Sequence, residues 1–333
     1  MRKGILASIV VILCVLILGS LYLYYQHIKT TNVDDIYIIL KKSATLEQVS
    51  KQLQEKNIIK YQSTFINYAK VKGFKESIED RNFIIKPKTK LKDLIIKLKN
   101  GKSEFTVITI PEGYTLYQIA SKLEKNNLVK KDDILNEKLS ALKGNTLILR
   151  KNDVYYDLEG YLFPDTYYIL NNTRKDEIIN IMVDRFKTVF SDKYKARTKE
   201  LGLDVNKVIT IASLIEREAA NDGERSRIAG VIYNRLKKGI SLQVDAAVIY
   251  ANTKGAKGID KVYYKTLKVK SKYNTYLYKG LPPGPIASPG KASIEAALYP
   301  EKNDYLYYVA SGNGHVFSET YKEHLNNVKK YIK

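Results

Sequence analysis

The sequence is poor in the residues that form disulfides and bind metals. Its 333 residues include one cysteine, Cys14, so no internal disulfide can form. The three histidines, His27, His315 and His324, are far apart and have no spacing typical of a zinc site. The glycines of "SGNGHVF" (311–317) do not lead from a strand into a helix, which indicates a turn instead of a phosphate loop. We therefore expect no metal and no cofactor.

Acidic residues are also few. The chain has 35 Asp and Glu against 56 Lys and Arg, a formal net charge of +21. Such an excess suggests nucleic-acid binding, but the lysines are scattered singly along solvent faces and form no basic stripe. If the soluble part lies outside the cytoplasm, the expected polyanions are lipid head groups and acidic peptides. We expect no nucleic-acid partner.

Charge is absent altogether from "GILASIVVILCVLILGSLYLYY" (4–25). At 1.5 Å per residue, this run is long enough to cross the hydrocarbon core of a bilayer. Arg2 and Lys3 precede it, so the positive-inside rule places the N-terminus in the cytoplasm. A cleaved signal peptide would have a shorter apolar region and a small-residue cleavage site. We expect a cytoplasmic tip at 1–4, a transmembrane helix at 5–25 and the remainder outside the cytoplasmic membrane.

The rest of the chain predicts an α+β protein. Its length and its 44% hydrophobic content suit two or three domains with sizeable cores. "DIYIIL" (35–40) is a short β-like run. "SATLEQVSKQLQEKNII" (43–59) has the pattern of a capped helix, with Ser43 or Thr45 as the N-cap. The pattern that follows predicts a helix near 63–73 and then a strand, a turn and a helix over 81–102.

A repeat connects this helix to a later segment. "TVITIPEGYTLYQIASKLEKNNLV" (106–129) matches it at five positions: Thr45, Leu46, Gln48, Leu53 and Asn57 correspond to Thr115, Leu116, Gln118, Leu123 and Asn127. Each unit has the pattern of a strand, a turn and an amphipathic helix, which resembles the small glycan-binding LysM-type module. We expect a LysM-like βαα module at 36–102 and a larger mixed α+β domain at 105–333. Strand–turn–helix units recur in many proteins, so the repeat alone does not establish glycan binding.

Three later segments have the composition of binding sites. "LEGYLFPDTYYIL" (158–170) is rich in aromatic side chains, which form cores and also stack on sugar rings. "KYNTYLYKGLPPGPIASPG" (272–290) holds four of the eight prolines, which indicates an ordered loop with a structural or a functional role. "GVIYNRLKKGISLQVDAAVIYA" (230–251) contains a helix that stops near Gly239. That segment brings four polar residues close together in the sequence: Asn234, Arg235, Gln243 and Asp245.

An apolar helix predicted at 207–220 carries two glutamates, Glu216 and Glu218. Advancing about 100° per residue places Glu218 within the apolar arc and Glu216 at its boundary. A carboxyl group in apolar surroundings has a raised pKa, which a general acid working near neutral pH requires. A buried salt bridge to Arg225 or Arg235 is the alternative interpretation, and the pattern alone leaves both open.

Three segments, "ASLIEREAANDGERSRIAGVIYNRLKKGISLQVD", "YNTYLYKGLPPGPIASPG" and "EGYLFPDTY", together resemble the YceG-like (MltG) family of endolytic murein transglycosylases. The layout is similar too: an anchor, a LysM-like portion and then a catalytic domain at 105–333. The resemblance covers nearly the whole chain. It implies an enzyme that cuts peptidoglycan glycan strands internally, near the outer face of the cytoplasmic membrane. One departure is "DAAVIY" (245–250), where the family usually has Pro-Thr after the aspartate, which leaves the local loop open.

The resemblance also implies a mechanism. The family's catalytic glutamate is the second one of its I-E-[KR]-E motif, here Glu218. As an acid it would protonate the oxygen between N-acetylmuramic acid and N-acetylglucosamine. As a base it would then take the proton of the C6 hydroxyl, whose attack on the anomeric carbon forms a 1,6-anhydro ring. Glu216 and Glu224 are expected in structural pairs. Candidates for binding the sugar are Asn234, Gln243, Asp245, Tyr273, Asn274 and Tyr276.

The expected partners are peptidoglycan strands and the membrane. Peptidoglycan synthases are further candidates if the enzyme ends the elongation of nascent strands. Two other functions stay open. A muramidase would hydrolyse the same bond, with Asp245 or Glu216 as a second carboxylate. A non-enzymatic wall-binding scaffold would use the repeats at 36–129. The chemistry of the new chain end distinguishes the first, and the activity of a Glu218 variant distinguishes the second.

Overall fold

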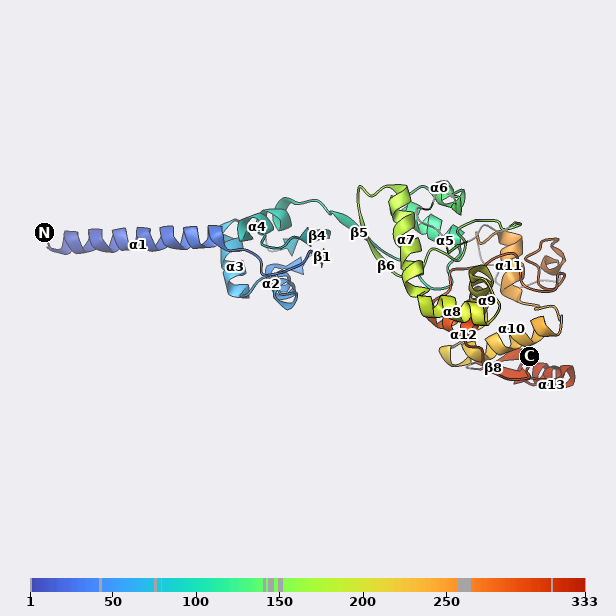
Figure 1. The fold of residues 1–333 in the computed structure, drawn as a ribbon. Coiled ribbons are helices and arrows are strands. Elements are labelled where there is room, and N and C mark those ends of the chain that lie inside the picture. Colours follow the sequence, from blue (N-terminus) through green and yellow to red (C-terminus); the bar gives the residue numbers. More distant parts are fainter. Residues whose placement is uncertain are drawn as a thin grey trace. The chain divides into compact units, whose positions relative to one another are not determined.

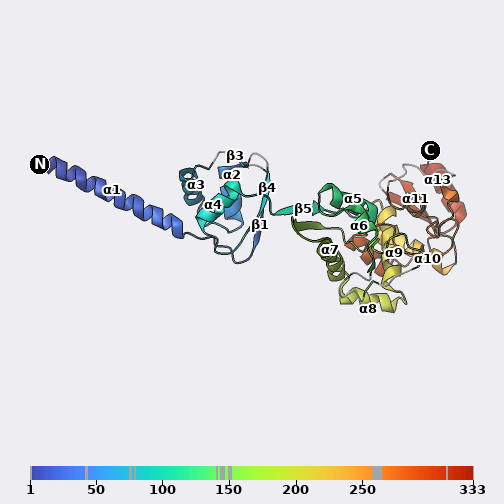
Figure 2. The same cartoon turned by 90° about the horizontal axis from the view of Figure 1, so that it is seen from above.

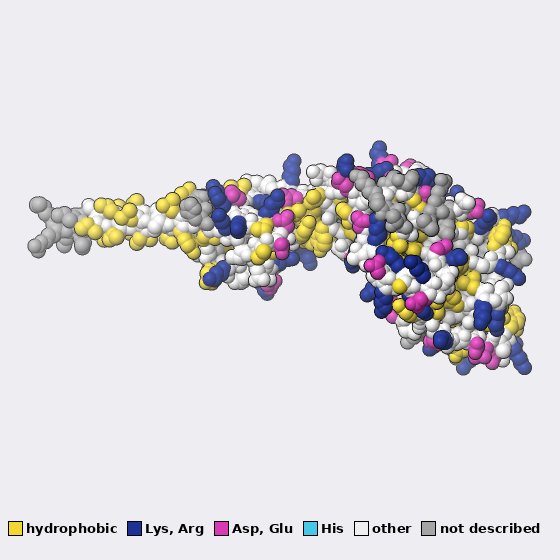
Figure 3. Space-filling model, in the orientation of Figure 1, with side chains coloured by type: hydrophobic (Ala, Val, Ile, Leu, Met, Phe, Trp, Pro, Cys, Tyr) yellow, Lys and Arg dark blue, Asp and Glu magenta, His cyan; other side chains and the backbone are white. Residues whose placement is uncertain are grey.

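The computed structural model describes residues 2–41, 44–74, 77–78, 80–139, 142, 147–148, 152–256, 265–312 and 314–332. The chain divides into two compact units, Met1–Thr106 and Val107–Lys333 (Figure 1). Both contain helices and short antiparallel strands, so the predicted α+β class is confirmed. On the face drawn in Figure 3, Lys and Arg side chains are dispersed and form no single stripe, as their scatter in the sequence predicts.

The first helix is α1 (Arg2–His27). Its apolar side chains between Ile9 and Leu23 are exposed, and they appear as a yellow surface in Figure 3. Within the part of the chain that the structure describes, no helix combines the length and the apolar character needed to cross a membrane. The structure therefore does not support the membrane-spanning segment expected at 5–25.

The core of the first unit lies between an antiparallel strand pair and the helices α2 (Leu46–Glu55), α3 (Gln62–Val71) and α4 (Leu91–Asn100). β1 (Ile36–Leu40) pairs with β4 (Arg81–Ile85), with Ile38 opposite Phe83. Both of these residues are fully buried together with Leu53, Phe65 and Leu94. A short second pair joins β2 (Ala44–Thr45) to β3 (Ser77–Ile78).

The predicted elements of this unit occur in their expected order. Thr45 is the N-cap of α2: its hydroxyl accepts from the backbone N–H of Gln48, and the Gln48 side chain returns the bond in a capping box. Ser43, the alternative N-cap, lies outside the described residues. Gly101 ends α4 as predicted. Whether this βαα arrangement at 36–102 functions as a LysM-type module stays a prediction.

The second unit is mostly helical around one large core. Its described elements are β5 (Phe105–Thr109), which begins in the last two residues of the first unit, α5 (Leu116–Lys125), α6 (Lys131–Leu135), β6 (Thr166–Leu170), α7 (Lys175–Val189), α8 (Asp192–Glu200), α9 (Val205–Glu218), α10 (Arg225–Lys237), α11 (Asp245–Thr253), α12 (Lys291–Leu298), β7 (Tyr307–Ser311), β8 (Gly314–Ser318) and α13 (Tyr321–Tyr331), with the 3-10 turns η2 (Asp222–Glu224) and η3 (Thr266–Lys268). β5 pairs with β6, and β7 with β8. α9 contacts α8, α10, α11 and α12, and the two ribbon views show it surrounded by other elements (Figures 1 and 2).

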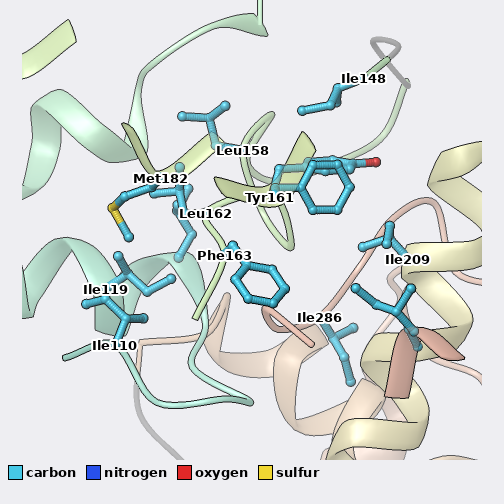
Figure 4. Packing of buried hydrophobic residues seen from close by; sticks show 14 of the residues in the cluster. Ile110, Ile119, Ile148, Leu158, Tyr161, Leu162, Phe163, Met182, Ile209 and Ile286 are labelled. Carbon is cyan, nitrogen blue, oxygen red and sulfur yellow. The ribbon is translucent and has the colours of Figure 1, made fainter. Parts of the chain in front are cut away.

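The aromatic segment 158–170 supplies the centre of this core. Leu162 lies beside Ile119 and Met182 on one side, and Phe163 faces Ile286 on the other (Figure 4). Tyr161 is also buried, and its hydroxyl donates to the side-chain oxygen of Asn206 at 3.0 Å. These aromatic side chains therefore form the core of the second unit.

Candidate active site

The site is built at the C-terminal end of α9. Asp204 caps the helix start, where its side chain accepts from the backbone N–H of Lys207 at 2.8 Å. Apolar residues at helical spacing are fully buried along the helix: Val208, Ile211, Leu214 and Ile215. Glu218 is the last helical residue, and Ala219 after it is extended. The buried stripe therefore fixes where the Glu218 carboxyl group lies.

The Glu218 carboxyl group sits in a largely desolvated position. The Tyr308 hydroxyl, from β7, donates to Glu218 Oε2 at 2.9 Å, and the backbone N–H of Ala246, from α11, also donates to it. Burial, together with the nearby charge of Asp245, raises the pKa of Glu218 to about 7, against the two hydrogen bonds, which lower it. The carboxyl group therefore exchanges its proton near neutral pH, as a group that acts as acid and then base requires.

A second carboxylate, that of Asp245, lies near the Glu218 carboxyl group and is exposed to solvent. Asp245 is exposed at the start of α11 and accepts a hydrogen bond of 2.6 Å from the Tyr276 hydroxyl. Burial raises the pKa of Tyr276 above its usual range, and the charge of Glu218 adds to the rise. Of the predicted site residues, Asp245 and Tyr276 are thus brought to Glu218.

Gln243 is also near this group, and Arg235 holds it there. The Arg235 guanidinium is buried and donates to the carbonyls of Leu242 at 2.9 Å and Leu306 at 2.6 Å. It also donates to Gln243 Oε1 at 3.2 Å. Gln243 is exposed, and its positive φ of 54° is uncommon for a residue other than glycine.

Three predicted binding residues have structural roles instead. The Asn234 amide nitrogen donates to the carbonyls of Asn303 and Tyr305, which braces the segment before β7. Asn274 is fully buried, and its side chain holds the loop that it belongs to. Tyr273 is 1% exposed; its ring stacks on that of Tyr155 and packs at a tilt against that of Tyr250, in both cases with ring centres 4.9 Å apart. Proximity in the sequence could not separate these packed residues from Gln243 and Asp245.

The other glutamate of the motif faces a different neighbour. Glu216 Oε2 accepts from the Gly290 N–H at 2.9 Å and the Ser293 hydroxyl at 2.8 Å, both at the start of α12. Arg225 lies 3.5 Å from the same oxygen. The salt bridge to Arg225 that the sequence allowed is thus formed by Glu216. Among the described residues, Glu218 has no cation within 4 Å.

No local pattern in the sequence pointed directly to the contribution of the β7–β8 hairpin. Tyr308 donates to Glu218 across 90 residues of sequence. Most of the turn predicted at 311–317 is strand instead, because Ser311 ends β7 and 314–317 belong to β8. Gly312, which follows β7, has a positive φ of 53°, and Asn313 lies outside the described residues. Strand alternation in "YLYYVAS" could have suggested that Tyr308 points to a site, but not to which one.

A cleft adjoins the site on the α5 side. It is lined by Thr115, Gln118, Arg217, Ala246, Ile249, Tyr250, Thr253, Gly255 and Ile286. Ala246 and Arg217 connect it to Glu218, because one donates to the carboxyl group and the other precedes it in the chain. The described residues contain no group of three His, Cys, Asp or Glu side chains that could hold a metal ion.

Known proteins share this chain's sequence and fold. The YceG-like family matches residues 38–330. An endolytic murein transglycosylase of Bacillus subtilis is 36% identical over 95% of this chain and 91% of its own length. One of Streptococcus pneumoniae is 29% identical over 99% of this chain and 65% of its own length. A YceG-like protein of Listeria monocytogenes of known structure has a TM-score of 0.61 at 34% identity, covering 89% of this chain and 99% of that one. The chain therefore belongs to the YceG-like family.

Proposed function

We propose that this protein is an endolytic murein transglycosylase whose acid and base is Glu218. The observation that carries the proposal is the Glu218 carboxyl group, half-buried at the end of α9 with a pKa raised to about 7. Its relatives in Bacillus subtilis and Streptococcus pneumoniae carry the name of this activity. The proposed substrate is the glycan strand of peptidoglycan, cut between N-acetylmuramic acid and N-acetylglucosamine.

The proposed reaction needs one carboxyl group in two protonation states. Protonated Glu218 gives its proton to the glycosidic oxygen as the bond to the anomeric carbon breaks. The resulting carboxylate takes the proton of the C6 hydroxyl, whose oxygen bonds to the same carbon. No water is consumed, and the new muramic end is a 1,6-anhydro ring. Because the nucleophile is already on the substrate, its entropic cost is low. The Tyr308 hydroxyl and the Ala246 N–H stabilise the carboxylate between the two steps.

Exposed polar groups beside Glu218 are proposed to orient the sugar. Gln243 and Asp245 are exposed, and Tyr276 is half-buried and bonded to Asp245. Arg235 fixes the Gln243 loop without facing solvent. The binding set proposed from the structure is therefore Gln243, Asp245 and Tyr276.

Asp245 also favours a second candidate function. Its charge is close enough to raise the pKa of Glu218, so two carboxyl groups share this site. A muramidase uses such a pair to place a water molecule against the anomeric carbon. Asp245 accepts from Tyr276 and is exposed, so a water molecule can reach it from solvent. The fate of one oxygen atom separates the two reactions.

The deciding experiment is digestion of purified, uncrosslinked peptidoglycan strands in water enriched in ¹⁸O. Mass spectrometry of the released fragments reads the new muramic ends. We expect 1,6-anhydro ends, lighter than reducing ends by one water, without ¹⁸O, on fragments of several disaccharides. Reducing ends that carry ¹⁸O at the anomeric carbon would make the protein a muramidase.

A matched pair of variants tests the assignment of Glu218. Glu218→Gln keeps the shape of the side chain but cannot give or take the proton, so cleavage is lost. Its melting temperature stays unchanged or rises, because a desolvated acid is no longer buried. Glu216→Gln, two residues earlier on α9, keeps measurable cleavage because the Glu216 side chain bonds to the start of α12. The reverse pattern would show that Glu216 is the catalytic residue.

The location and partners proposed for the enzyme rest on the sequence. The uncharged run 4–25 after Arg2 and Lys3 favours attachment to the cytoplasmic membrane with the second unit outside. There the enzyme would reach nascent strands and the synthases that make them. A reporter active only in the cytoplasm, fused to Lys333, should stay silent. Strong reporter activity would contradict this location.

A further inference from the structure

The loop after α9 is tied to the β7–β8 hairpin by one buried side chain, Glu224. Glu224 Oε1 accepts from the backbone N–H of Ala220 at 2.6 Å, two residues after Glu218. The same oxygen lies 2.9 Å from His315 Nδ1, and Oε2 accepts from the backbone N–H of His315 at 3.0 Å. The Glu224 carboxylate thus bonds at once to the end of α9 and to β8.

The hairpin leaves room for this contact. A Cβ atom on Gly314 would lie 2.9 Å from Glu224 Oε2, closer than real Cβ contacts. The His315 ring then packs edge-on against the ring of Tyr308, with centres 5.2 Å apart. Tyr308 stands on the partner strand of the same hairpin and donates to Glu218. A continuous set of contacts therefore runs from Glu224 through His315 and Tyr308 to Glu218.

We propose that Glu224 is a positioning residue for the reaction: it fixes the end of α9 to the hairpin so that Tyr308 holds the Glu218 carboxyl group. The proposal rests on the proposed function of Glu218. The hydrogen bond from Tyr308 to Glu218 joins two segments that are about 90 residues apart in the chain. Glu224 and His315 join those same segments only a few residues from each partner. An error of an ångström in placing a catalytic group costs up to about 100-fold in rate.

Glu216 offers a matched control. Its side chain is 8% exposed and that of Glu224 is 7% exposed. Both glutamates flank Glu218 in the sequence, and both accept backbone and side-chain hydrogen bonds. Only Glu224 contacts the hairpin that carries Tyr308, whereas Glu216 contacts α12. Neutralising either one removes a buried, hydrogen-bonded carboxylate, so losses due to instability alone should be similar.

The test is a double-mutant cycle on cleavage of uncrosslinked strands by the full chain. Glu224→Gln places an NH₂ group against an N–H donor and so breaks the link. We expect kcat to fall roughly 10- to 100-fold with KM within about twofold of wild type. In a Tyr308→Phe background the same change should cost less than about threefold, because the hydrogen bond that it positions is already gone. Glu216→Gln should keep kcat within about threefold of wild type at a similar melting temperature.

His315→Ala provides a second, milder variant. It keeps the backbone N–H from which Glu224 Oε2 accepts, and it removes the ring that packs on Tyr308 and contacts Glu224 Oε1. We expect a smaller loss of kcat, again suppressed by Tyr308→Phe. Equal losses of kcat in Glu216→Gln and Glu224→Gln, or additive effects of Glu224→Gln and Tyr308→Phe, would overturn the positioning role while leaving Glu218 in place. A wild-type protein that does not cleave the strands would overturn the proposed function and this inference with it.

Discussion

The two helices of the internal repeat, α2 and α5, have the same local structure in two different settings. Both N-caps, Thr45 and Thr115, have φ −77° and ψ 161°, and both form a capping box with a glutamine three residues later. Both helices are followed by an asparagine at positive φ, Asn57 at 54° and Asn127 at 55°. Ten-residue helices with the same caps thus arise wherever this short sequence occurs.

The settings differ at the N-terminal ends. Thr45 is exposed at the start of α2. Thr115 is half-buried, and its hydroxyl donates to the carbonyl of Gly255 at 2.7 Å. The next N–H in α5, that of Leu116, donates to the buried carboxyl group of Glu159 at 2.8 Å. The repeat therefore forms the helix, and residues far away in the sequence attach it to the wall of the cleft beside Glu218.

The largest expected effect comes from removing Glu159, whose carboxyl group accepts from the first turn of α5. Glu159 is 2% exposed and also accepts from the Tyr250 hydroxyl at 2.9 Å. Glu159→Ala leaves the Leu116 N–H and that hydroxyl buried without a partner, so we expect the second unit to lose about 3 kcal/mol of stability. Native-state hydrogen exchange measures this as faster exchange in α5 with unchanged exchange in α2. Unchanged protection in α5 would show that the cap alone holds its first turn.

The next effect is a dependence of stability on pH, which we expect at α5 in the second unit and not at α2 in the first. Burial raises the pKa of Glu159 from 4.5 to about 8, against hydrogen bonds that lower it. The folded state therefore binds this proton more tightly than the unfolded state. Proton binding by Glu159 therefore stabilises the folded state fully below about pH 4.5, and this stabilisation is lost as the pH rises through 8. Glu159→Gln, which stays neutral, should flatten this decline by on the order of 2 kcal/mol. Urea unfolding followed at α5 between pH 5 and 8 measures the slope, and an equal slope in both proteins would contradict it.

The contrast between local pattern and tertiary contact also explains which features could be predicted from the sequence and which could not. The capped helices and the position of Glu218 at the end of the apolar helix α9 follow from local patterns. Tyr308, Glu224 and His315 were not found as part of the site, because their contacts join segments about 90 residues apart. Asn234, Tyr273 and Asn274 were selected for their nearness in sequence, and packing turned them inward. Side-chain type and spacing predict the elements, whereas tertiary contacts decide which polar groups face the cleft.

A smaller effect should separate the two N-caps. Thr45→Ala removes one capping hydrogen bond at a solvated helix end, which costs about 1 kcal/mol. Thr115→Ala removes the equivalent bond and also the one to Gly255, so we expect about 2 kcal/mol. Chemical denaturation of the two variants, followed by exchange in α2 and α5, gives the comparison. Equal losses would show that the bond to Gly255 adds nothing, and Thr→Ser at either position serves as the control that keeps the hydroxyl.

The smallest effect should be the same in both units. Asn57 and Asn127 are exposed in left-handed backbone conformation, which asparagine tolerates at some cost and glycine adopts without strain. Substitution by glycine relieves that strain but adds freedom to the unfolded chain, so we expect each change to stay within about 0.5 kcal/mol of wild type. The backbone bonds that close the two turns are alike, 2.8 Å from Asn57 N to Gln54 O and 2.9 Å from Asn127 N to Glu124 O. Asn57→Gly and Asn127→Gly should therefore shift the stability of their own units by equal amounts, measured by exchange in α2 and α5. A difference greater than about 1 kcal/mol would mean that tertiary packing, which distinguishes the N-terminal ends, also controls the C-terminal turns.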